Sequence, residues 1–209
     1  MRELFENQLK TLNENLTTMG TMCIDCITFA TQALLTSHVE IANKSIALED
    51  EIDEKKREIE NLCMKILLKQ QPVAHDLKTI SNALKMITDL ERIGDQASDI
   101  AEIARHICIS QSKHSMHIAQ MSDAVINMVM DAIRSFVNQD KTLAVKVIKQ
   151  DDIVDDLFSK IRKDLVDMMC RGIIQKEEYA QEAISTLMIA KYLERIGDHI
   201  VNVAECVED

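Results

Sequence analysis

Glycine, proline and tryptophan are scarce in this chain of 209 residues, which has four glycines, one proline and no tryptophan. Glycine-rich ligand loops and the many turns of a sheet-rich fold both need turn-forming residues. No Gly-x-Gly-x-x-Gly, Walker A or Gly-x-Ser-x-Gly motif is present. Hydrophobic residues make up 46% of the chain and charged residues 28%, which is typical of a globular protein with a buried core. The composition predicts an all-α protein.

Positive charge and aromatic side chains are also in short supply. The 24 Lys and Arg face 35 Asp and Glu, which gives a net charge of −11, and only four Phe and two Tyr are available for base stacking. Proteins that bind nucleic acid need clustered Lys and Arg, and this chain has no basic block. No apolar run approaches the ~20 residues that span a bilayer, and no apolar segment follows the charged first residues. We expect a cytoplasmic protein with no nucleic-acid partner and no direct membrane insertion.

An internal duplication covers almost the whole chain. The sequence Glu-Arg-Ile-Gly-Asp occurs at 91–95 and again at 194–198, an offset of 103 positions. The tails that follow both copies match, and acidic pairs upstream match at an offset of 102. A unit slightly over one hundred residues long is therefore present twice. We place the first repeat at 1–110 and the second at 111–209.

Hydrophobic periodicity indicates three long helices in each repeat. An unbroken heptad pattern runs from Phe5 to Ala33, and its copy begins at Ile118. The expected helices are 3–36, 38–70, 73–109, 115–138, 141–171 and 176–207. Because short loops make neighbouring helices antiparallel, we predict six long antiparallel helices in two tandem, pseudo-symmetric three-helix bundles.

A few residues set the expected helix boundaries. Residues 37–40, Ser-His-Val-Glu, have the pattern of a capping box that starts the second helix. Pro72 suits the first turn of the third helix, and Asp140 is a candidate N-cap of the fifth. Gly172 is placed to end the fifth helix.

Acidic residues form one stripe on the third helix. At 100° per residue, Glu91, Asp95, Asp99 and Glu102 fall together, away from the apolar face around Ile93. Like charges one turn apart destabilise a helix by ~0.2–0.5 kcal/mol per pair, and no Lys or Arg interrupts this stripe. The second repeat keeps the pattern, with Asn in the third place.

If adjacent helices meet along these stripes, each bundle presents about five carboxylates at close range. Hard cations prefer such oxygen-only sites, and iron or manganese also fits them. The candidate metal ligands are Glu49, Asp53, Glu91, Asp95 and Asp99 in the first repeat, and Asp151, Asp155, Glu194 and Asp198 in the second. The alternative interpretation is a solvated acidic face neutralised by neighbouring cations such as Arg92, Lys55 and Lys56.

Other notable residues favour structural roles. Cys23-x-x-Cys26 lies on the heptad pattern and has no second cysteine pair at metal-binding spacing, so we expect a buried core pair. Gly94 and Gly197 lie inside helices, where close helix approach explains them better than a kink that opens room for a ligand. His199 follows a candidate ligand and is either a surface residue or a peripheral ligand. We find no nucleophile–base pair and expect no catalytic residues.

The chain resembles the PhoU family of bacterial phosphate regulators over essentially its full length. The resemblance rests on Gln70-Gln71-Pro72, on both Glu-Arg-Ile-Gly-Asp copies with their tails, and on the acidic pairs in the second and fifth helices. It implies a cytoplasmic, dimeric, non-enzymatic negative regulator of high-affinity phosphate uptake and phosphate-starvation signalling. The implied partners are the ATPase subunit of a phosphate ABC transporter and a membrane sensor histidine kinase.

The resemblance also implies a multinuclear metal on the candidate carboxylates, with iron, zinc, manganese or magnesium as possible metals. Asn202 replaces the counterpart of Asp99, so we expect the second site to hold metal more weakly or with a different nuclearity. The second repeat also lacks a Gln-Gln-Pro counterpart, and partner surfaces of the two repeats are expected to differ. A metal-storage protein and a metal-dependent hydrolase are the alternative functions.

Overall fold

A computed structural model describes residues 2–70, 74–109 and 114–208, and the regular elements in these ranges are six helices. They are α1 (Arg2–Thr36), α2 (Val39–Gln70), α3 (Ala74–Ala104), α4 (Ser115–Asn138), α5 (Lys141–Cys170) and α6 (Glu177–Glu208). The largest difference from the predicted bounds is the end of α3, which stops at Ala104. Beyond it, the backbone N–H of Ile109 donates to Leu34 O at 3.1 Å, which ties the link between the repeats to the end of α1.

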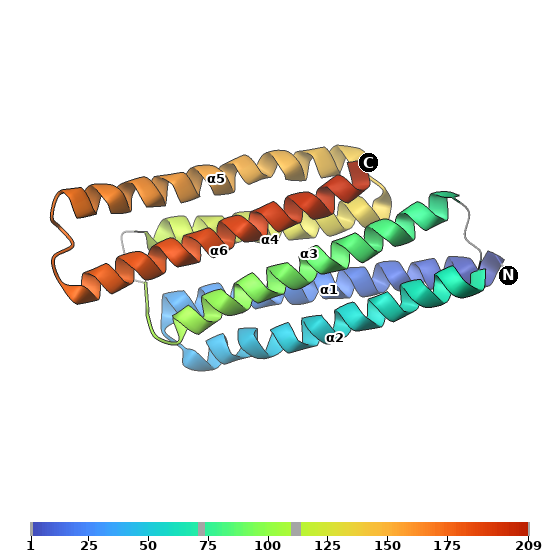
Figure 1. Cartoon of the computed structure of the whole chain (residues 1–209), viewed down its shortest axis with the longest axis horizontal. Helices are drawn as coiled ribbons and strands as arrows, with labels where there is room; N and C mark the ends of the chain where they lie inside the picture. The colour runs from blue at the N-terminus through green and yellow to red at the C-terminus, as the bar shows by residue number, and fades with distance from the viewer. Residues whose placement is uncertain (1, 71–73, 110–113, 209) are drawn as a thin grey trace.

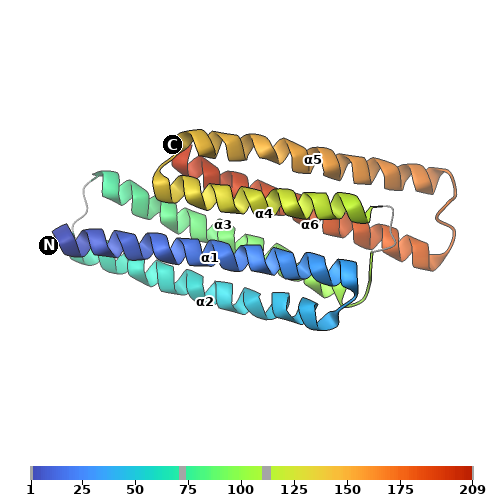
Figure 2. The ribbon, with the colours of Figure 1, turned by 180° about the vertical axis from the view of Figure 1, so that it is seen from behind.

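The six helices form two three-helix bundles that lie side by side in one elongated molecule (Figure 1). Helices α1–α3 form one bundle and α4–α6 the other, and the view from behind shows α1 and α4 adjacent (Figure 2). The bundles meet where α3 packs on α6 and where α1 packs on α4. The predicted fold of two pseudo-symmetric three-helix bundles is confirmed.

The contact between α1 and α4 shows the pseudo-twofold symmetry residue by residue. Gly20 lies against Ile133, and a Cβ at position 20 would lie only 2.7 Å from Ile133 Cγ1. The repeat counterparts of this pair are Ser122 and Thr31, whose hydroxyl oxygens are hydrogen-bonded at 2.8 Å in a buried position. The same crossing therefore occurs twice, once as a close apolar approach and once as a buried polar pair.

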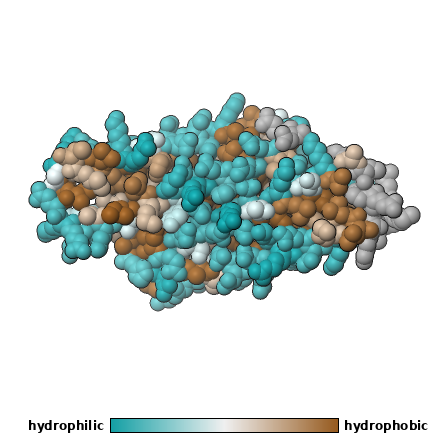
Figure 3. Space-filling view, viewed as in Figure 1, coloured by the Kyte–Doolittle hydropathy of each residue, from teal (hydrophilic) through white to brown (hydrophobic). Residues whose placement is uncertain are grey.

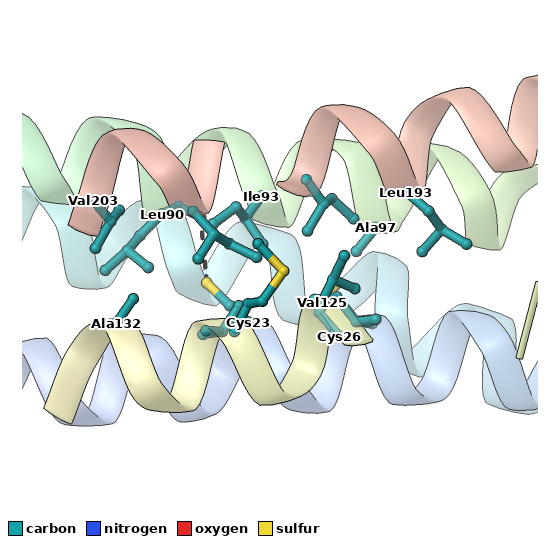
Figure 4. Close-up of a cluster of buried hydrophobic side chains, with 14 of the residues drawn as sticks. Cys23, Cys26, Leu90, Ile93, Ala97, Val125, Ala132, Leu193 and Val203 are labelled. Atoms are coloured by element: carbon teal, nitrogen blue, oxygen red, sulfur yellow. Dashed lines mark hydrogen bonds between the residues drawn. The ribbon is translucent and has the colours of Figure 1, made fainter. Parts of the chain in front are cut away.

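The hydrophobic core is continuous across both bundles. Figure 4 shows Leu90 and Ile93 of α3, Val125 of α4 and Leu193 of α6 gathered around the cysteines of α1. All four of these side chains are at most 1% exposed. Because one core takes side chains from helices of both repeats, neither repeat buries its apolar face alone.

The two cysteines of Cys23-x-x-Cys26 are core residues, as predicted. Cys23 Sγ donates to Leu90 O at 3.3 Å, and Cys26 Sγ lies 3.2 Å from Ser45 Oγ. Burial raises the pKa of the Cys23 thiol well above its ordinary range and that of Cys26 to about 11. Both thiols therefore stay protonated and hold α1 against its neighbours in the bundle.

The predicted caps of α5 are confirmed, whereas the capping box before α2 is wrong. Asp140 accepts a hydrogen bond from the Leu143 N–H at 3.0 Å, and Gly172 ends α5 with a φ of +66°. Ser37 instead has a φ of +58° and its N–H donates to Ala33 O, so it ends α1. The two-residue link leaves His38, whose carbonyl accepts the first bonds of α2, as the N-cap. Pro72 lies outside the described residues.

Helix α1 contains, within Phe5–Thr36, an 18-residue stretch with a mean hydropathy of 1.2, which is long and apolar enough to pass a length-and-composition test for a membrane span. Half of that stretch is buried inside the molecule, and α1 contributes Leu12, Leu16 and Met19 to the core. Core helices of globular proteins pass the same test, so α1 alone is weak evidence for a membrane span.

Hydrophilic residues cover the middle of the face seen in Figure 1, and hydrophobic residues gather toward its two ends (Figure 3). The end of the molecule formed by α5 and α6 carries several exposed hydrophobic side chains. They are Val166, Met169, Ile173, Tyr179, Ile184 and Met188. The candidate carboxylates lie on the parts of α5 and α6 nearer the middle of the molecule.

Replacing Gly20 with leucine tests the α1–α4 contact. We expect Gly20→Leu to lower the free energy of unfolding by about 1–3 kcal/mol, because Ile133 leaves no room for a side chain. The melting temperature should fall by about 2–4 °C per kcal/mol. Thr21→Leu, at the exposed next position, is the control, and adding Ile133→Ala should restore part of the loss. Equal melting temperatures for Gly20→Leu and Thr21→Leu would contradict the close approach.

Candidate functional site

The first cluster of carboxylates is formed by α2 and α3, and we define it as Glu49, Asp53, Glu91 and Asp95. Partial burial, followed by the charges of Asp53 and Asp95, raises the pKa of Glu49. Partial burial and the charge of Glu91 likewise raise the pKa of Asp95, against the opposing effect of Arg92. The structure therefore brings the predicted residues of the two helices into one electrostatic group.

The second cluster is the repeat counterpart on α5 and α6, and we define it as Asp151, Asp155, Glu194 and Asp198. Partial burial and the charges of Asp155 and Asp198 raise the pKa of Asp151 to about 6. Within the described part of the chain, the buried Asp151 Oδ1 has no hydrogen-bond partner. A carboxylate that is half-buried, surrounded by like charges and without a donor gains from any cation placed beside it.

Glycines allow the helices of each repeat to approach where the carboxylates meet. A Cβ at Gly94 would lie 3.0 Å from Ile52 Cδ1 of α2, and a Cβ at Gly197 would overlap Asp151 Oδ1 of α5. The predicted reason for these glycines, close helix approach, is confirmed. At Gly197 the neighbour is itself a candidate ligand, so this glycine makes space for the Asp151 carboxylate.

The two clusters differ in how their charge is balanced. In the first, Lys56 Nζ lies 3.0 Å from Glu91 across the two helices, and Arg57 reaches Asp53 at 3.6 Å. Phe158 and Ser159 stand at the corresponding positions of α5, so α5 supplies no cation there, and Lys191 Nζ of α6 lies 5.5 Å from the centre of the Phe158 ring. Its Glu194 pairs instead with Lys191 of its own helix. The solvated-face interpretation thus describes the first cluster better than the second.

The third position of the acidic stripe has a different neighbourhood in each repeat. Partial burial and the charge of Asp95 raise the pKa of Asp99, and Arg195 of α6 acts in the opposite direction. The counterpart, Asn202, donates to Asp89 Oδ1 at 3.0 Å across α3 and α6. His199 Nδ1 lies 2.9 Å from the same oxygen.

Asp89, His199 and Asn202 therefore form a polar joint between the two bundles. His199 is half-buried in this joint and is neither a free surface residue nor directed at the second cluster. Sequence reasoning missed Asp89, because the hydrogen bond from His199 spans 110 positions and Asp89 belongs to no repeated motif.

Across the described ranges, no three His, Cys, Asp or Glu side chains already stand as ligands of a single ion. The donor chemistry still suits a hard cation, since each cluster offers four carboxylates from two helices. The pKa values of Glu49, Asp95, Asp151 and Asp198 are raised, so a cation beside them would relieve repulsion between like charges. Metal binding by the nine candidate residues therefore stays a prediction.

The comparisons with known proteins bear on the whole chain. The family model described as "PhoU domain" matches twice, at residues 16–104 and 118–207. The chain belongs to the PhoU family. The two matches contain both copies of the Glu-Arg-Ile-Gly-Asp motif and both carboxylate clusters, so the resemblance noted in the sequence is confirmed.

Relatives match over nearly their full length. The phosphate-specific transport system accessory protein PhoU homolog of Clostridium acetobutylicum is 35% identical, over 98% of this chain and 92% of the relative. PhoU homolog 1 of Thermotoga maritima is 33% identical, over 96% of this chain and 86% of the relative. The crystal structure of PhoU from Pseudomonas aeruginosa has a TM-score of 0.88 at 29% identity and covers 97% of this chain and 96% of that one.

Asp151→Asn tests the electrostatic state of the second cluster. The pKa of Asp151 is raised from its ordinary value of 3.8 to about 6, so its charged form destabilises the fold. The folded state keeps this proton to higher pH than the unfolded state, so the contribution of this group falls as pH rises from about 4 to above 6. In metal-free protein we expect Asp151→Asn to raise the melting temperature by about 2–4 °C at pH 7.5 and by almost nothing near pH 4.

The control for this prediction is Asp123→Asn, which neutralises an exposed aspartate of α4 outside both clusters. Thermal unfolding followed by circular dichroism across this pH range gives both curves. A pH-independent difference between Asp151→Asn and the wild type would contradict the electrostatic explanation.

Proposed function

We propose that this protein is a cytoplasmic negative regulator of high-affinity phosphate uptake and of phosphate-starvation signalling. It acts as a non-enzymatic adaptor, and its partners are the ATPase subunit of a phosphate ABC transporter and a membrane sensor histidine kinase. The observation that carries the proposal is the similarity to phosphate-specific transport system accessory proteins over 98% of this chain, through both repeats. A homodimer is the proposed assembly.

The two carboxylate clusters are the proposed metal sites of this adaptor, with Asp99 as an extension of the first. A cation bound there would neutralise the repulsion between carboxylates of adjacent helices. Glu49 and Asp53 would hold α2 against Glu91 and Asp95 of α3, and the second cluster would hold α5 against α6 in the same way. The residues thereby set the angle between helices whose outer faces receive the partners.

A second candidate function is metal storage or handling. The duplicated set of four carboxylates supports it, because each repeat supplies the same oxygen-only donors. High stoichiometric uptake and release of metal would favour this function. A regulator needs only enough bound metal to fix the helices.

Deletion of the gene tests the regulatory role. In excess phosphate, we expect a deletion strain to keep phosphate uptake and phosphate-starvation gene output high, and the wild-type gene to restore repression. Phosphate uptake and a starvation-promoter reporter measure both effects. If neither changes in a strain that lacks any second copy of the gene, the regulatory proposal is wrong, and metal handling becomes the leading function.

Lys56→Gln tests whether the charge balance sets metal affinity in the first cluster. Removing the Lys56–Glu91 pair should raise the affinity of the first cluster for Mn²⁺ about fivefold, roughly 1 kcal/mol for a partly exposed ion pair. Isothermal titration in an Asp151→Ala/Asp198→Ala background isolates the first cluster. Lys65→Gln, an exposed lysine further along α2, is the control.

A second titration, in an Asp53→Ala/Asp95→Ala background that leaves the second cluster intact, orders the two clusters. We expect the second cluster, where Lys191 pairs with Glu194, to bind Mn²⁺ more tightly than the first, where Lys56 and Arg57 both pair with carboxylates. The replacement of Asp99 by Asn202 in the second repeat led us to expect the opposite order. In the structure Asn202 hydrogen-bonds to Asp89 at the joint between the bundles. Tighter binding to the first cluster, or no effect of Lys56→Gln, would contradict the charge-balance argument.

A further inference from the structure

A groove runs along α5 on its α4 side. Two adjoining hollows of about 510 and 410 Å³ share Ile153 in their lining. Together they follow α5 from Thr142 to Lys160, a length of about 27 Å at 1.5 Å per residue. Figure 2 shows α4 and α5 side by side along this stretch. We call this feature the α4–α5 groove and define it by Lys149, Ile153, Leu157 and Lys160 of α5 and Gln120 of α4.

The groove combines an exposed apolar floor with two separated positive charges. Ile153 is 54% exposed in the middle of a long helix, and Leu157 lies one turn further on, half-buried. Lys149 and Lys160 are exposed and make no ion pair with any residue that the structure describes, whereas Lys146 is paired with Asp131 at 3.1 Å. Asp156 is the acidic residue of the lining. The chain has a net charge of −11, and here two unpaired lysines lie beside an exposed isoleucine.

The first repeat provides an internal comparison. At an offset of 102, Lys149, Ile153, Leu157 and Lys160 correspond to Ala47, Glu51, Lys55 and Glu58 of α2. Lys55 and Glu58 pair with each other, so that face is an ordinary solvated surface. The second repeat has isoleucine and lysine where the first has Glu51 and Glu58, and lysine where the first has Ala47. The character of the groove therefore does not follow from the duplicated fold alone.

We propose that the α4–α5 groove docks an amphipathic helix of a partner protein, with apolar residues on Ile153 and Leu157 and acidic residues paired with Lys149 and Lys160. The inference rests on the proposed adaptor function. A straight groove of this length accepts a helix of about five turns, whose apolar side chains recur at the spacing of Ile153 and Leu157. Lys149 and Lys160 favour a partner helix that has acidic residues beside its apolar face, because opposite charges then meet.

A designed peptide tests the proposal directly. The probe is an 18-residue helical peptide with leucines on one face and glutamates beside them, and its partner probe carries lysines in place of the glutamates. We expect the wild-type protein to bind the glutamate peptide at least tenfold more tightly than the lysine peptide, despite the net charge of −11. Fluorescence anisotropy at two salt concentrations measures both affinities, and added salt should weaken the preferred complex.

Matched variants locate the binding site. Ile153→Glu/Lys160→Glu installs the residues of the first repeat and should weaken binding of the glutamate peptide at least tenfold. Lys149→Ala/Lys160→Ala leaves the apolar floor and should remove most of the preference for glutamate. Glu51→Gln/Glu58→Gln on the first repeat is the control and should leave binding unchanged. Circular dichroism melting checks that each variant is folded.

Two results would overturn the proposal. One is a failure of the peptide test, either because both peptides bind equally or because the folded Ile153→Glu/Lys160→Glu variant binds the glutamate peptide as tightly as the wild type. The other is a dimer in sedimentation that this variant dissociates, since a second copy of the chain would then cover the groove. Failure of the deletion strain to derepress phosphate uptake would instead overturn the regulatory function and leave the peptide result standing.

Discussion

Burial of one hydrophobic core between the two repeats is the interaction on which the rest of the structure depends. Helices α1, α3, α4 and α6 contribute fully buried side chains to it, among them Leu16, Ile93 and Ile196. Each such side chain contributes about 1.5–3 kcal/mol, whereas a like-charge pair on a helix costs about 0.2–0.5 kcal/mol. A handful of core contacts therefore outweighs the repulsion within both carboxylate clusters, and the fold can hold these charges together.

In the carboxylate clusters the fold brings together like charges that repel one another. Positions where the fold accepts such a local cost are often functional sites. Gly197 illustrates this, because a helix-breaking residue is retained at the point where Asp151 needs room. One difference between the repeats lies at the clusters, where Lys56 crosses between helices in the first and Phe158 stands in its place in the second. Two clusters with the same carboxylate donors thus have different charge balance, which is the basis for the different metal affinities that we propose.

The sequence was sufficient to predict the helices, the repeat and the carboxylate stripes, because each depends on residues within one helix. Periodicity locates a buried face, and a stripe of acids is visible on a helical wheel. Ser37 and His38 could not be assigned correctly, because the choice of cap depends on how a two-residue link reverses the chain. The Asp89–His199 bond was also beyond reach, and Lys56 could be named as a neutralising cation but not paired with Glu91, since both contacts join helices whose register is set only by packing.

Helix α5 connects the two proposals through its geometry. Asp151 and Asp155 lie on the face of α5 opposite to Ile153, so the second cluster and the α4–α5 groove share one helix. A helix of 30 residues is a rigid element, and a change in its position against α6 also changes its position against α4. A displacement of α5 at the second cluster would therefore also change the width of the groove. Coupling of this kind requires no pathway of side chains through the core, because the helix itself carries the displacement from one face to the other.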